Sequence, residues 1–129
     1  MDGLAPFLGE WALITDGSRV GQAPVASTLL LEDLGDRLLL LVLFTGEDGR
    51  TLRLERELSY DAPTESGSAT VTLEMTADGA LETIVREGEV EVARARRVLR
   101  EDGVLEITQR GVTHEGEAFA HVARYQRVE

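Results

Sequence analysis

The sequence contains no cysteine, so neither a disulfide bond nor a thiolate metal site is available to it. Its longest apolar run, Leu38–Phe44, is far too short to cross a bilayer as a helix. The start, Met1–Phe7, lacks the basic residues and the apolar stretch of a signal peptide. These absences lead us to expect a soluble, cytoplasmic protein that does not enter the membrane.

Lysine is also absent, so all 13 basic residues are arginines, and they face 24 aspartates and glutamates. The formal net charge is −11. An acidic surface repels the phosphates of nucleic acids and of anionic membranes, and we expect neither as a partner. The simplest interpretation of the densest basic cluster is a solvated strand face. Its members are Arg94, Arg96, Arg97 and Arg100.

Signatures of enzymes are missing as well. The chain has no cysteine nucleophile, no Gly-x-Ser-x-Gly elbow, no phosphate-binding loop and no His-Glu-x-x-His motif. With two histidines and no suggestive spacing, it offers no zinc site. We therefore expect a binding protein rather than an enzyme, with no resident metal.

The dominant pattern is a series of short β-type segments separated by turn signals such as Asp78-Gly79 and Asp102-Gly103. Short connections favour antiparallel neighbours, because parallel strands need long crossovers. A brief helical turn is expected before Gly9. The nine predicted strands are Gly9–Asp16, Val25–Glu32, Arg37–Thr45, Thr51–Tyr60, Ala69–Ala77, Ala80–Glu87, Val90–Arg100, Val104–Arg110 and Glu117–Val128.

Most of these segments alternate between apolar and polar residues, which indicates one dry face and one wet face. The segment Leu38–Phe44 is apolar on both faces. Its outer face is expected to be covered by the N-terminal segment or by a second copy of the chain, so a homodimer is an open alternative.

A few polar residues fall on the dry faces. Arg56 lies on the same face as the apolar residues Leu54 and Leu58, and Gln109 shares a face with Ile107. In Val90–Arg100 either choice of inner face places at least one arginine inside. The aromatics of the last strand indicate which of its faces points inward; that face carries Phe119, His121, Ala123 and Tyr125.

Each of these residues has two interpretations. An unpaired buried arginine is costly, so Arg56 and Arg97 could reach water or an internal carboxylate. They could instead receive the anionic group of a ligand in a cavity, assisted by Gln109 and Tyr125. His121 could be a hydrogen-bonded core residue, or it could be the axial ligand of a haem iron.

Both ends of the chain resemble known barrels. Pro6-Phe7-Leu8-Gly9-Glu10-Trp11 is similar to the start of fatty-acid-binding proteins and nitrobindins, which belong to the calycins. The stretch from Arg97 to Thr108, with its Asp-Gly turn, resembles two neighbouring strands of fatty-acid-binding proteins. The ending Ala123-Arg124-Tyr125 resembles their last strand, which binds a ligand carboxylate through Arg-x-Tyr.

The resemblance implies a barrel that holds a fatty-acid-like ligand, with Trp11 closing one end. In this chain Ala123 takes the place of the arginine of Arg-x-Tyr. The resemblance therefore assigns carboxylate binding only to Tyr125 and Arg97. Gly17–Pro24 leaves no room for the helical lid of fatty-acid-binding proteins. Nitrobindins also lack the lid, and their haem-binding histidine matches His121 in the segment His121–Val128.

We therefore predict an all-β fold over residues 1–129, a single antiparallel up-and-down barrel of eight to ten strands of the calycin type. Its predicted function is binding of a small hydrophobic, fatty-acid-like anion without a cofactor. Haem binding through His121 and a barrel enzyme acting on a hydrophobic molecule are the alternatives. The predicted ligand-binding residues are Trp11, Arg56, Met75, Arg97, Gln109, Phe119, His121 and Tyr125.

Overall fold

The computed structural model describes residues 1–14, 26–46, 48–113 and 115–128. The described residues form ten strands, preceded by one turn of 3-10 helix, η1 (Ala5–Phe7). The strands are β1 (Gly9–Leu13), β2 (Ala26–Asp33), β3 (Arg37–Thr45), β4 (Thr51–Ser59), β5 (Thr64–Ser66), β6 (Ala69–Met75), β7 (Leu81–Glu87), β8 (Val90–Leu99), β9 (Leu105–Val112) and β10 (Ala118–Arg127).

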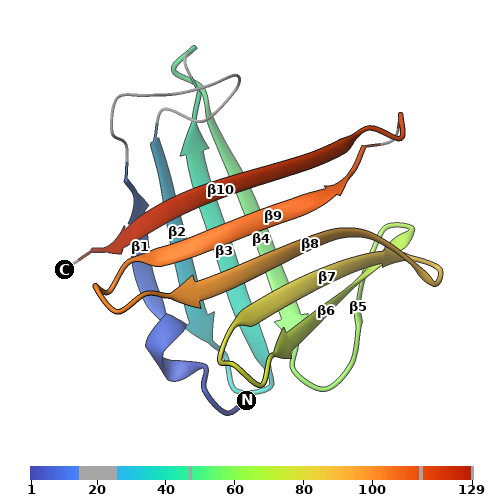
Figure 1. Cartoon of the computed structure of the whole chain (residues 1–129), viewed down its shortest axis with the longest axis horizontal. Coiled ribbons are helices and arrows are strands. Elements are labelled where there is room, and N and C mark those ends of the chain that lie inside the picture. The colour runs from blue at the N-terminus through green and yellow to red at the C-terminus, as the bar shows by residue number, and fades with distance from the viewer. Residues whose placement is uncertain (15–25, 47, 114, 129) are drawn as a thin grey trace.

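All strand pairs are antiparallel, and the order across the sheet is β4-β3-β2-β1-β10-β9-β8-β7-β6-β5. The first and last strands pair at Leu13 and Tyr125, so the sheet curls back on itself. In Figure 1 the strands β1–β4 cross steeply behind β6–β10, which makes two layers around one interior. The barrel is nearly closed where β4 meets β5 and β6, and the backbone N–H of Ser59 donates to Oγ1 of Thr64 there at 3.0 Å. The predicted all-β barrel and the helical turn before Gly9 are confirmed.

One predicted loop contains a strand. The predicted strands Thr51–Tyr60 and Ala69–Ala77 leave a loop between them that includes Asp61–Gly67, but residues 64–66 form β5 and pair with β6. The two strands are joined by Gly67-Ser68, and Gly67 has a φ of 63°. Glycine at the first central position is typical of the two-residue turns that join hairpins. In the sequence, Gly67-Ser68 is therefore the feature that indicates a hairpin here, and with it a tenth strand.

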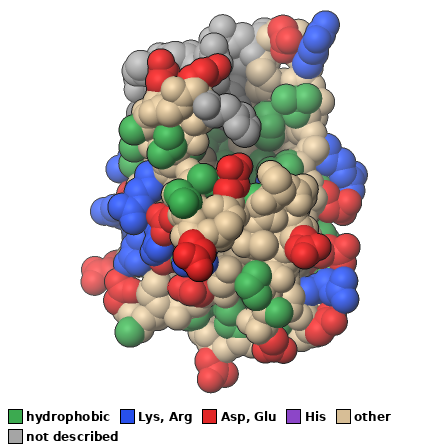
Figure 2. All heavy atoms as spheres, turned by 90° about the vertical axis from the view of Figure 1, so that its right-hand side faces the viewer, with side chains coloured by type: hydrophobic (Ala, Val, Ile, Leu, Met, Phe, Trp, Pro, Cys, Tyr) green, Lys and Arg blue, Asp and Glu red, His purple; other side chains and the backbone are tan. Residues whose placement is uncertain are grey.

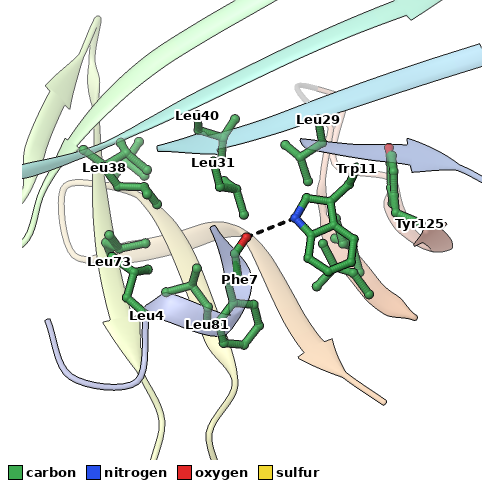
Figure 3. Close-up of a cluster of buried hydrophobic side chains, with 14 residues drawn as sticks. Leu4, Phe7, Trp11, Leu29, Leu31, Leu38, Leu40, Leu73, Leu81 and Tyr125 are labelled. Carbon is green, nitrogen blue, oxygen red and sulfur yellow. Dashed lines mark hydrogen bonds between the residues drawn. The ribbon is translucent and has the colours of Figure 1, made fainter. Parts of the chain in front are cut away.

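The hydrophobic core fills the end of the barrel next to η1. Leu4 and Phe7 point into it from the N-terminal segment and contact the same cluster as Leu73 and Leu81 (Figure 3). Trp11 is almost fully buried, and its indole Nε1 donates to the backbone oxygen of Phe7 at 3.0 Å. The N-terminal segment therefore closes this end of the barrel. The interior toward the other end lies outside this core, so its lining can have a different composition.

The outer face of β3 is not covered by the N-terminal segment, because the apolar residues of that segment enter the core instead. Leu43 is exposed on this face, and Leu39 and Leu41 are half-buried. Cover by a second copy of the chain stays a prediction. The predicted loop Gly17–Pro24 lies outside the described residues. Within the described residues, no helix is long and apolar enough to span a bilayer.

Candidate functional site

A cavity of about 240 Å³ lies inside the barrel, between the wall formed by β3 and β4 and the wall formed by β6–β10. It opens to solvent on one side. Its lining is mostly apolar and carries polar groups at a few points. The lining residues are Leu40, Leu54, Arg56, Leu58, Val71, Thr83, Val85, Ala93, Arg94, Ala95, Arg97, Gln109, Arg110 and Phe119.

Small residues on β8 make room for the cavity. Ala93 and Ala95 occupy successive inward positions, opposite Val85 and Thr83 of β7. Larger side chains at the same positions would reach into the interior, as the leucines do at the core end. Ala95 was not among the predicted site residues, although alanine at every second position of a strand indicates unfilled space on its inner face.

Arg97 is the next inward residue of β8, and only 6% of it is exposed. Its Nη1 donates to Oγ1 of Thr83 at 3.3 Å, and its buried Nε has no hydrogen-bond partner. Burial lowers the pKa of Arg97 to about 10, and the neighbouring Tyr125 partly opposes that shift. The guanidinium therefore stays charged at neutral pH, inside the barrel, with no carboxylate paired to it among the described residues.

Arg56 lines the same cavity from the opposite wall. It lies on β4, directly across from Leu40 of β3, and it is half-buried. Neighbouring Arg53 pairs with Glu55 on the outer face. Arg56 itself makes no ion pair or hydrogen bond to another described residue, so its guanidinium is available to a ligand.

The remaining arginines of β8 point outward. Glu82, which is 7% exposed, accepts from Arg94 at 2.8 Å and from Arg96 at 3.2 Å. This buried carboxylate fixes the outer face of β8 and thereby sends Arg97 inward, which settles the choice that the sequence left open. Arg94 borders the cavity but is already engaged by Glu82 and Glu91.

No aspartate or glutamate is found among the described residues that line the cavity. This contrasts with the chain as a whole, where acidic residues outnumber basic ones by 24 to 13. On the face shown in Figure 2, acidic and basic side chains lie intermixed, with hydrophobic ones between them. Among the described residues, the charged side chains that line the cavity are therefore all basic, whereas the chain as a whole is acidic.

Four predicted ligand-binding residues line the cavity, namely Arg56, Arg97, Gln109 and Phe119. Trp11 and Met75 do not. Trp11 belongs to the core at the closed end, where the guanidinium of Arg127 lies 4.3 Å from the centre of its ring. Met75 is partly buried against the same core.

Tyr125 is buried beside the cavity rather than in its lining. Its hydroxyl lies 3.1 Å from Oγ of Ser27, on the opposite layer of the barrel. Tyr125 also opposes the lowering of the Arg97 pKa by burial. In this position Tyr125 joins the two layers of the barrel.

His121 was expected to face an apolar interior, and this expectation is wrong because the side chain is exposed. It lies on β10 opposite Gln109 of β9, which is exposed as well. Its ring stacks on Phe119, with 5.6 Å between the ring centres. A haem needs its histidine ligand inside an apolar pocket, so the surroundings of His121 do not fit a haem. No group of three metal-binding side chains occurs within the described ranges.

Phe119 lies over Gly111 of the neighbouring strand β9. A Cβ atom at Gly111 would come within 2.7 Å of the Phe119 ring and 2.6 Å of the backbone oxygen of Val92. Glycine is therefore required at this point for the phenyl ring to lie flat against the sheet at the mouth of the cavity.

Comparison with solved structures identifies the type of barrel. The crystal structure of the wild-type fluorescent protein UnaG matches with a TM-score of 0.64 and 13% identity, covering 97% of this chain and 99% of that one. The chain has the fold of the calycin barrels. Two variants of UnaG match with TM-scores of 0.62 and 0.63, again at 13% identity. No protein-family model and no curated protein matches the sequence.

Proposed function

We propose that this calycin-type barrel binds a small apolar molecule that carries an acidic group. The observation that carries the proposal is Arg97, a buried guanidinium with an unpartnered Nε at the edge of a largely apolar cavity. A charge that is buried without a partner costs several kcal/mol. A ligand carboxylate there would offset that cost and form charge-assisted hydrogen bonds with the guanidinium.

The apolar part of the ligand would supply the rest of the affinity. Leu40, Leu58 and Val71 line the cavity, and burial of hydrocarbon against them contributes about 25 cal/mol per Å² before the loss of ligand freedom is deducted. The likeness of the chain ends to fatty-acid-binding proteins supports the same class of ligand. A cytoplasmic site of action, expected from the sequence, belongs to this proposal.

The test is binding of anilinonaphthalene sulfonate, an apolar fluorescent anion, to the wild-type protein and to Arg97→Met. We expect the wild type to bind the probe and the variant to bind it at least tenfold more weakly, because hydrogen bonds to charged groups contribute about 1.5–3 kcal/mol. Arg124→Met is the matched control: its side chain pairs with Glu106 on the outer face. This control is expected to bind like the wild type.

A long-chain fatty alcohol that displaces the probe would report on the apolar part of the cavity alone. We expect its affinity to change little in Arg97→Met. If both arginine variants lose the same amount of probe binding, or if the wild type binds no probe, the proposal is wrong.

A further inference from the structure

Two guanidinium groups enter the cavity from different walls. By strand alternation Arg56 on β4 and Arg97 on β8 both point inward, and both line the cavity. Of the other two arginines that border it, Arg94 is held by Glu82 and Glu91 on the outer face, and Arg110 is directly opposite Arg94 and shares that face. Among the described arginines that line the cavity, Arg56 and Arg97 are therefore the two available to a bound molecule.

The two groups occupy different environments. Arg97 is buried, and Arg56 is half-exposed toward the open side of the cavity. Arg97 therefore offers a binding point deep in the barrel, and Arg56 offers a second one on the facing wall, nearer to solvent.

We infer that the ligand carries two acidic groups, one at each end of an apolar body. Arg97 takes the inner group and Arg56 takes the group nearer the mouth. The apolar lining of the cavity, which includes Leu54, Leu58 and Ala95, contacts the body of the molecule. This inference rests on the proposed function and narrows its ligand from an apolar acid to an apolar diacid.

A single anion shared by both arginines is the competing arrangement. In that arrangement the apolar lining would contact a ligand whose far end carries no charge. Removal of either arginine would then weaken the binding of a monoacid to the same extent. The two arrangements therefore differ in how each arginine responds to removal of one acidic group from the ligand.

The experiment measures binding of decanedioic acid and decanoic acid by calorimetry, with the wild type, Arg56→Gln and Arg97→Gln. We expect the diacid to bind wild type roughly tenfold or more tightly than the monoacid. Arg56→Gln should weaken the diacid by a similar factor and leave the monoacid nearly unchanged. Arg97→Gln should weaken both acids.

The outcomes separate the two proposals. If both acids bind the wild type equally and Arg56→Gln affects both or neither, the diacid inference is wrong while the proposed function stands. If neither acid binds and the anionic probe is also not retained, the proposed function fails. Circular dichroism of both variants verifies that each retains its β structure, since both positions face the interior.

Discussion

Arg97 carries a buried charge that has no carboxylate partner among the described residues. Its guanidinium is surrounded by apolar lining, it has one weak hydrogen bond to Thr83, and its Nε has none. A residue selected for stability alone would be apolar at this position, because an uncompensated buried charge is unfavourable. Under the proposed function, an anion bound at this site would offset that cost.

Replacing Arg97 with methionine should therefore stabilise the free protein. We expect the free energy of unfolding to rise by about 1–3 kcal/mol, since the desolvation cost of the buried charge disappears and the volume is largely kept. Urea denaturation in the absence of ligand measures the change.

Arg94→Met provides the contrast on the same strand. Removal of Arg94 deprives the buried carboxylate of Glu82 of its shorter ion pair, which is 2.8 Å long. Stability should fall by about 1–3 kcal/mol. A loss of stability in both variants would show that Arg97 acts as a structural residue rather than as a vacant binding group.

The strands themselves were largely predictable, because period-two alternation and Asp-Gly turns are local signals. The strand β5 was missed because three residues are too few to show alternation. The inward face of β8 depended on Glu82, which lies on another strand, so the sequence of β8 alone could not decide it. His121 follows the correct alternation and is nevertheless exposed, and no local pattern of β10 carries that information.

The two alanines of β8 should control the size of the site. Ala95→Leu extends a side chain into the cavity, where space exists to receive it. We expect ligand affinity to fall at least tenfold, while the free energy of unfolding changes by less than about 1.5 kcal/mol because the added methyl groups fill a void. Calorimetric titration and urea denaturation measure the two effects.

Ala120→Leu is the matched control for this substitution, because Ala120 is exposed on β10 and lies opposite Arg110. Its ligand affinity should equal that of the wild type. Undiminished binding by Ala95→Leu would place the ligand outside the cavity.

At the scale of the whole molecule, the two ends of the barrel interior differ. One end is filled by η1, Trp11 and the leucine core. The interior beyond it keeps small residues and two arginines, so a ligand bound there as proposed would not disturb the core. The charge is divided as well: the chain carries a net charge of −11, while the cavity presents cationic groups.

This division of charge predicts an unusual salt dependence. An anionic ligand is repelled by the acidic surface during its approach and attracted only after it enters the barrel. Raising the ionic strength from about 0.01 M to about 1 M shortens the Debye length from about 30 Å to about 3 Å. The association rate constant of decanedioic acid should therefore increase with salt, as stopped-flow measurements can show. Decanol, which has no charge, is the control and should associate at a nearly constant rate. A fall in the rate for the diacid would mean that Arg56 near the mouth attracts the ligand from a distance, and that the acidic surface does not govern entry.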